Sequence, residues 1–88
     1  MIRRTITISN KLGLHARASA KLTQLAAKYQ CDVSMIRNGR RVNAKSIMGV
    51  MMLAAEYGSE LLLRADGTDE EDAVSAIAKL IESKFGES

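Results

Sequence analysis

The only histidine of the chain, His15, lies between a glycine-containing loop and a stretch with helical periodicity, and Arg17 follows it closely. The first N–H groups of a helix have no partner within the helix, so they favour anions. A neutral imidazole is a nucleophile, and an arginine can donate two parallel hydrogen bonds to a phosphoryl group. His15 and the side chain of Arg17, with the backbone N–H groups of Ala16, Arg17 and Ala18, therefore predict a site that accepts and holds a phosphoryl group.

A lone histidine is commonly an ordinary surface residue, but the context of His15 favours a functional role. Histidine is a poor helix N-cap compared with Ser, Thr, Asp or Asn, and local rules tend to break at functional sites. The partial positive charge of a helix N-terminus disfavours the imidazolium and stabilises an attached phosphoryl group. Each such interaction is worth about 0.3–2 kcal/mol, which suits a carrier that must also release the group. We expect Gly13 to let the backbone approach the ligand closely.

The composition predicts one small domain over residues 1–88 and argues against several classes of site. One His and one Cys do not make a ligand set, so we expect no metal and no cofactor. The lone Cys31 cannot form an internal disulfide, which fits a reducing cytoplasm. We expect no signal peptide, because Arg3 and Arg4 are followed by alternating Thr and Ile and not by an apolar core. We expect no membrane span, because no apolar run is long enough. The net charge of +3 suits acidic or phosphorylated partners without requiring nucleic acid.

The elements that must position this site follow the order β-α-β-β-α-β-α. Alternation predicts a strand over Ile2–Ile8, and apolar spacing of three and four predicts a helix over Ala16–Tyr29. The other predicted elements are strands over Asp32–Arg37 and Arg40–Asn43 joined by an Asn38-Gly39 turn, a helix from Ile47 to about Leu53, a strand over Glu60–Asp66, and a last helix capped by a Thr68–Glu71 capping box. The economical arrangement is an α+β fold, a four-stranded, mostly antiparallel sheet with three helices on one face.

Ser46 directly precedes the second predicted helix, and by itself it is explained as an N-cap serine. Ile47, Met48 and Met51 give this helix an apolar surface wider than one stripe. Some of the methionines pack in the core, but a helix this short cannot bury every apolar side. Exposed methionines suit a surface that must fit several partners.

Two segments of the chain resemble the HPr family, the histidine-containing phosphocarriers of the bacterial phosphoenolpyruvate-dependent sugar phosphotransferase system. They are Leu12–Arg17, which reads LGLHAR, and Asn43–Gly49, which reads NAKSIMG. The resemblance extends over essentially the whole chain, in length and in the order of elements. It implies an open-faced β-sandwich, which agrees with the layout predicted from periodicity.

The resemblance also implies a role for each part of the site. The chain would be a phosphocarrier and not by itself a turnover enzyme: Nδ1 of His15 would accept the phosphoryl group from enzyme I, Arg17 would assist, and sugar-specific enzyme IIA domains would receive it. Ser46 would be phosphorylated by an HPr kinase/phosphorylase. Enzyme I and the IIA domains would dock on a surface that comprises Lys21, Lys45, Ile47, Met48 and Met51. A monomer suits a carrier that exposes one site to many partners.

One position of the motif departs from the family pattern. Many members have proline directly after the motif arginine, where this chain has Ala18. Proline fits the first turn of a helix and has no N–H to donate, so Ala18 adds one donor to the anion site. We expect altered tuning of the site with activity retained.

Two alternative functions compete with the sugar-transport carrier. The nitrogen-related paralogue of HPr shares the histidine site and the fold but serves a regulatory phosphorelay, and the Lys45–Gly49 stretch favours HPr proper. A nucleic-acid patch on Arg37, Arg40 and Arg41 is the second alternative. It is disfavoured because aromatic residues, on which single strands usually stack, make up only 3% of the chain.

Overall fold

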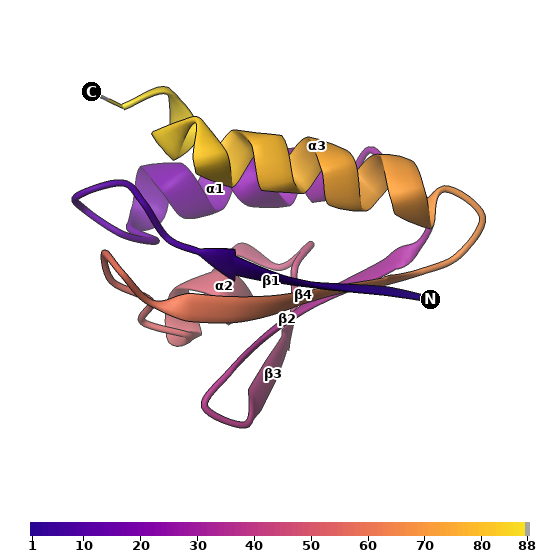
Figure 1. Ribbon diagram of the computed structural model, residues 1–88, viewed down its shortest axis with the longest axis horizontal. Helices are drawn as coiled ribbons and strands as arrows, with labels where there is room; N and C mark the ends of the chain where they lie inside the picture. Colours follow the sequence, from indigo (N-terminus) through magenta and orange to yellow (C-terminus); the bar gives the residue numbers. More distant parts are fainter. Residues whose placement is uncertain (88) are drawn as a thin grey trace.

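A four-stranded sheet forms one layer of the protein, and helices cover one of its faces (Figure 1). The computed structural model describes residues 1–87. The strands are β1 (Ile2–Thr7), β2 (Asp32–Arg37), β3 (Arg40–Asn43) and β4 (Glu60–Asp66), and the helices are α1 (Ala16–Ala26), α2 (Ile47–Met52) and α3 (Glu70–Glu82). The strand order is β1-β4-β2-β3, and every neighbouring pair is antiparallel. The predicted α+β open-faced sandwich is confirmed.

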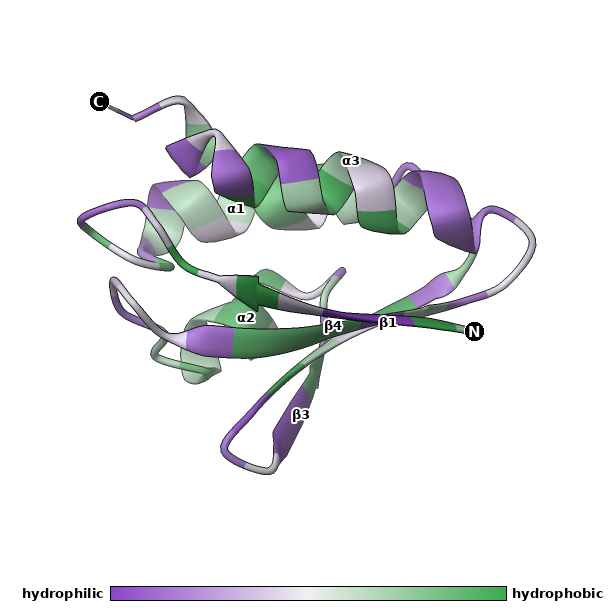
Figure 2. Cartoon of the chain, in the orientation of Figure 1, coloured by the Kyte–Doolittle hydropathy of each residue, from purple (hydrophilic) through white to green (hydrophobic). Residues whose placement is uncertain are grey.

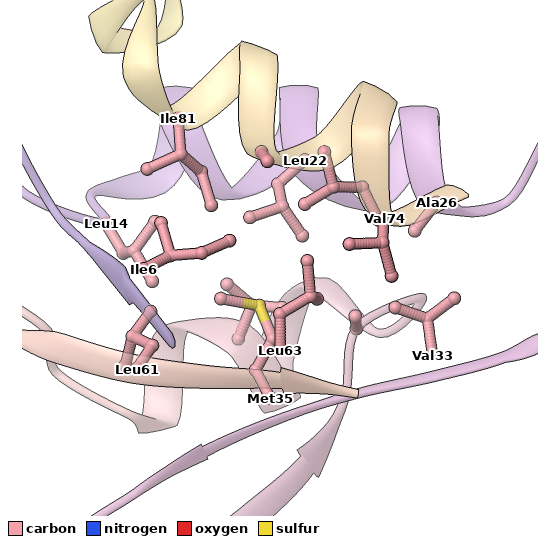
Figure 3. Close-up of a cluster of buried hydrophobic side chains, with 14 of the residues drawn as sticks. Ile6, Leu14, Leu22, Ala26, Val33, Met35, Leu61, Leu63, Val74 and Ile81 are labelled. Carbon is pink, nitrogen blue, oxygen red and sulfur yellow. The ribbon is translucent and has the colours of Figure 1, made fainter. Parts of the chain in front are cut away.

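The core lies between the sheet and the layer formed by α1 and α3 (Figure 3). Burial alternates along β4, as the two-residue period of a strand requires, and Leu61, Leu63 and Ala65 face the helices. Leu22 of α1 and Ile81 of α3 enter the core from the opposite side. None of the helices within residues 1–87 is long and apolar enough to cross a membrane.

The β2–β3 hairpin is built on the predicted Asn-Gly turn and also fixes the end of α2. Asn38 and Gly39 both have positive φ, 50° and 79°, as a type I′ turn demands. Arg37 Nη1 donates to Leu53 O at 2.9 Å, and Arg40 Nη1 donates to Met52 O at 3.4 Å. Two of the three arginines considered for nucleic-acid binding thus bind carbonyl groups at the end of α2.

The first helix ends at Ala26, earlier than the predicted end at Tyr29. Tyr29 N donates to Ala26 O at 3.2 Å, a tight turn of the 3₁₀ kind in place of a further α-helical turn. The carbonyl of Tyr29 accepts a hydrogen bond from Lys45 Nζ at 2.7 Å. The long-range bond from Lys45 satisfies a carbonyl at the helix end, and this partner could not be read from the helical periodicity.

The predicted capping box at the start of the last helix is wrong, because Asp69 and not Thr68 is the N-cap residue. The Asp69 carboxylate accepts hydrogen bonds from Gln30 N at 2.8 Å and Cys31 N at 2.9 Å, so it joins α3 to the start of β2. The bond from Gln30, more than that from Cys31, holds the pKa of Asp69 below its usual value. Gly67 N, in the loop before α3, donates a hydrogen bond to Glu70 Oε1 at 3.0 Å.

Candidate functional site

His15 is the N-cap residue of α1, as the sequence predicts. Its backbone is extended, with φ −73° and ψ 179°, and its side chain makes no capping hydrogen bond. The first bond of the helix runs from Ser19 N to His15 O at 2.8 Å, so the N–H groups of Ala16, Arg17 and Ala18 precede the helical ladder. The imidazole and these donors therefore share the positive end of α1.

The loop before His15 is held against the segment that follows α2. Leu14 N donates to Ala55 O at 2.9 Å. Gly13 has φ +67°, and a Cβ atom there would lie 2.5 Å from Ala55 O. The missing side chain of Gly13 lets two protein backbones meet, which fixes the position of His15 relative to α2; the close approach of Gly13 to a ligand stays a prediction.

Two residues that sequence reasoning missed contact each other beside the imidazole. Asn10 is only 1% exposed, and its Nδ2 donates to Gly13 O at 2.8 Å and to Glu87 Oε1 at 3.1 Å. The other oxygen of Glu87, Oε2, lies 2.5 Å from His15 Nε2. The bond to His15, and secondarily that to Asn10, lowers the pKa of the Glu87 carboxyl. No local pattern could indicate this contact, because Glu87 follows His15 by 72 residues.

The C-terminal segment returns to the start of α1 through an unusual backbone turn. Figure 1 shows the end of α3 and the start of α1 at the same end of the molecule. Lys84 and Phe85 have positive φ, 59° and 56°, and Phe85 is 1% exposed. Lys21 Nζ donates to Phe85 O at 2.7 Å. Lys21 therefore tethers this segment, and its ammonium keeps further N–H donors for a ligand or partner.

These residues form a shallow depression around His15. Its lining consists of Lys11, Leu12, His15, Ala16, Arg17, Lys21, Gly86 and Glu87. Three cationic side chains face one carboxylate, so the depression favours an anion. Lys11 and the exposed Leu12 were not predicted as site residues, although both belong to the loop that precedes His15.

Ser46 and the predicted docking residues of α2 lie outside the lining of this depression. Ser46 is the N-cap of α2, and its Oγ accepts a hydrogen bond from Gly49 N at 3.1 Å. Val50 points into the core, whereas Met48 is 68% exposed. We call the exposed side chains of Ile47, Met48, Met51 and Met52 the α2 patch; Met52 was not among the predicted docking residues. Figure 2 shows the hydrophobic colour of α2 along its length.

Cys31, whose thiol is another possible nucleophile, lies in the loop that joins α1 to β2 and is buried. Burial raises the pKa of its thiol to about 11. The thiolate, which is the reactive form, is therefore scarce near neutral pH. His15 is much better placed than Cys31 to act as a nucleophile.

Comparison with known proteins agrees with this geometry. The family described as the PTS HPr component phosphorylation site matches residues 2–83. The chain is 62% identical over 87 residues to phosphocarrier protein HPr of Cupriavidus necator, which covers 99% of this chain and 98% of that protein. It is 37% identical over 86 residues to phosphocarrier protein NPr of Shewanella violacea, covering 98% of this chain and 94% of that protein.

Solved structures agree with the sequence comparison. The crystal structure of HPr-C-His from Thermoanaerobacter tengcongensis has a TM-score of 0.97 and 48% identity, and covers 100% of this chain and 99% of that one. A crystal structure of an HPr dimer from the same organism has a TM-score of 0.80 and 48% identity, with 99% and 100% covered. The chain therefore belongs to the HPr family of phosphocarrier proteins of the phosphotransferase system.

Proposed function

We propose that this chain carries a phosphoryl group between proteins of the sugar phosphotransferase system, with Nδ1 of His15 as the acceptor atom. The observation that supports this most directly is the position of His15 as the N-cap of α1, in a depression with Lys11, Arg17 and Lys21. The ring is the nucleophile, and the helix N–H groups with Arg17 bind the phosphoryl oxygens. Each of these contacts is modest, which allows the group to be passed on.

Phospho-enzyme I is the proposed donor, and enzyme IIA domains are the proposed acceptors. Both would dock on the α2 patch, which offers flexible apolar side chains on a helix that packs against α1. Lys45 is tied to Tyr29 O, as Lys21 is tied to Phe85 O, but each ammonium has donors left for acidic groups of a partner. Arg17 is exposed and adds a third cation.

The test is phosphorylation of the purified chain with phosphoenolpyruvate and enzyme I. Intact-mass measurement should show one added phosphate, and acid treatment should remove it, because a phosphoramidate at a histidine is acid-labile. The His15→Ala chain should give no adduct, while Ser46→Ala, which leaves the imidazole in place, should give the same adduct as the natural chain. An adduct that persists on His15→Ala would refute the assignment.

The sugar branch is preferred to the nitrogen branch on two grounds: the Lys45–Gly49 stretch and the higher identity to HPr than to NPr. The two branches use different homologues of enzyme I. Parallel phosphorylation assays with each homologue should show much faster transfer from the sugar-branch enzyme. Faster transfer from the nitrogen-branch enzyme would reverse the choice.

Ser46 is the proposed regulatory site, a substrate of an HPr kinase/phosphorylase. A phosphate on this exposed N-cap would place negative charge directly beside the α2 patch. Asp is a good N-cap, so Ser46→Asp should unfold at the same urea concentration as the natural chain yet accept phosphate from enzyme I more slowly. Ser46→Ala is the neutral control. Equal initial rates for all three chains would remove Ser46 from the regulatory account.

We also propose that the carrier is a cytoplasmic monomer. One copy already holds the complete depression around His15, and the buried Cys31 forms no disulfide among the described residues. Sedimentation equilibrium at working concentrations should give the mass of one chain, 9.6 kDa. A dimer mass would show that this chain associates, as the homologue from Thermoanaerobacter tengcongensis does in its dimer crystal.

A further inference from the structure

Glu87 contacts the ring nitrogen of His15 that the proposed transfer does not use. Its Oε2 lies 2.5 Å from Nε2. An ionised carboxylate only accepts hydrogen bonds, so Nε2 must be the atom that carries the proton. When one nitrogen of an imidazole is held protonated, the other nitrogen keeps its lone pair. The hydrogen bond thus selects the form of the ring in which Nδ1 is the nucleophile.

We propose that Glu87 is a positioning residue for phosphoryl transfer: its carboxylate holds the proton on Nε2 of His15, so that Nδ1 presents its lone pair to phosphorus and the ring later leaves as a neutral imidazole. This inference rests on the phosphocarrier function proposed above. It adds Glu87 to the residues that support that function, and it assigns the ring proton of His15 to Nε2.

The proton on Nε2 matters in both directions of the transfer. On acceptance, the Nδ1 lone pair forms the bond to phosphorus, the bond from phosphorus to the donor atom of phospho-enzyme I breaks, and its electron pair stays with that atom. The proton remains on Nε2, so the ring becomes cationic and the Glu87 carboxylate balances its charge. On release, the bond between Nδ1 and phosphorus breaks and its electron pair returns to a neutral ring. Without the Nε2 proton the leaving group would be an imidazolate anion.

The carboxylate is held in place by a buried amide. Asn10 Nδ2 donates to Glu87 Oε1 and to Gly13 O, and both of these atoms can only accept, which settles the orientation of the amide. The same orientation leaves Asn10 Oδ1 buried without a hydrogen-bond partner among residues 1–87. A buried polar atom without a partner is unusual and calls for a reason. Here the reason is that Nδ2 must face the carboxylate of Glu87.

The backbone that delivers Glu87 to the site is also unusual. Lys84 and Phe85 adopt positive φ, a conformation that residues other than glycine rarely adopt. Such conformations persist only where the surroundings determine them, and they cluster at functional sites. Burial of Phe85 and the bond from Lys21 to its carbonyl supply that determination. The segment is therefore held in a shape that brings Glu87 to His15.

The first test determines which ring nitrogen of His15 carries the proton in the unphosphorylated protein. Proton–nitrogen NMR spectra of the ¹⁵N-labelled chain should show an Nε2–H signal of His15 that is protected from exchange with water. Glu87→Ala should abolish this protection, and Glu87→Gln should reduce it, because the amide oxygen still accepts but carries no charge. Glu82→Ala is the matched control, because Glu82 is an acidic residue at the end of α3 that pairs with Arg4 instead.

The second test measures transfer from phospho-enzyme I with the carrier as the varied substrate. At metal-binding histidines, loss of the orienting hydrogen bond typically costs about 10- to 100-fold, and we take that as the scale of the effect here. We expect kcat to fall in that range for Glu87→Ala with KM unchanged, because the α2 patch is untouched. Glu87→Gln should lie between Glu87→Ala and the natural chain, and Glu82→Ala should match the natural chain.

The outcomes separate this inference from the function on which it rests. If the natural chain forms the acid-labile adduct but Glu87→Ala keeps both the protected Nε2–H signal and its kcat, the inference is overturned and the carrier function stands. Faster transfer by Glu87→Ala would also overturn it, since the carboxylate would then hinder the approach of the phosphoryl group. No adduct on the natural chain would defeat the carrier function itself.

Discussion

At position 13 both the backbone conformation and the available space require glycine. Gly13 has φ +67°, and a Cβ atom would lie 2.5 Å from Ala55 O and 2.9 Å from Glu56 Cα. Neither neighbour is the end of a flexible side chain, so the backbone itself would have to move. The hydrogen bond from Leu14 N to Ala55 O, which fixes the loop before His15, would be disturbed by that movement.

Gly13→Ala should therefore lower the free energy of unfolding by about 2–4 kcal/mol, the combined cost of the left-handed conformation and of the overpacking. Gly39→Ala is the matched control, because Gly39 has φ +79° but nothing within 4 Å of its Cβ position. It should lose only about 1–2 kcal/mol. Urea denaturation of the two variants and of the natural chain measures both losses in free energy of unfolding. Equal losses would show that the clash with Ala55 is relieved without cost.

The chemistry of His15 could be predicted from sequence because its cause is local. The glycine-containing loop, the histidine, the arginine and the helical spacing are contiguous, and together they place the imidazole at a helix N-terminus. Glu87 and Asn10 could not be predicted in the same way. Their contact depends on the turn at Lys84 and Phe85 and on the packing of α3 against α1, which no short window of sequence encodes.

At the scale of elements, the carboxylate of Asp69 connects the start of α3 to the start of β2. The hydrogen bond from Gln30 N holds the pKa of Asp69 below its usual value, and the bond from Cys31 N adds to this effect. A depressed carboxyl pKa means that the folded state binds the proton less readily than the unfolded state. The stabilisation is therefore complete above the ordinary Asp pKa and is lost as the pH falls through the depressed value.

Unfolding experiments between pH 7 and pH 2 should show this loss in the natural chain and less of it in Asp69→Asn. The asparagine removes the titrating group, so its free energy of unfolding should be lower near pH 7 and should fall less steeply below about pH 4. Asp72→Asn, in the same turn of α3 and exposed, is the control and should keep the natural slope. An identical slope in Asp69→Asn would contradict the role assigned to these bonds.

Elements governed by short-range rules agree with the sequence prediction, and those governed by distant partners do not. The Asn38-Gly39 turn fixes its hairpin through the positive φ of two neighbouring residues. The start of α3 also carried a local pattern, Thr68 to Glu71, but the long-range bonds of Asp69 prevailed over it. The end of α1 also differs from the prediction, and a distant partner is again involved, since Lys45 donates a hydrogen bond to Tyr29 O.

At the scale of the whole molecule, Phe85 connects the C-terminal segment to the core. Its side chain is 1% exposed, although it lies beyond the last long helix. Phe85→Ala should lower the free energy of unfolding by about 3–5 kcal/mol, a large part of the stability of a small domain. Thermal and urea unfolding measure this loss. A change below about 1 kcal/mol would mean that the surrounding residues collapse into the space.

The sheet has two edges, β1 and β3, and each edge strand carries a pair of neighbouring arginines. Arg3 and Arg4 lie in β1, and Arg40 and Arg41 lie in β3; all four are exposed. An open strand edge is a template on which another chain can add its own strand, and charged side chains oppose that addition. The paired arginines therefore oppose the addition of a foreign strand at both borders of the sheet, and on β3 one of them, Arg40, also holds the end of α2 through Met52 O.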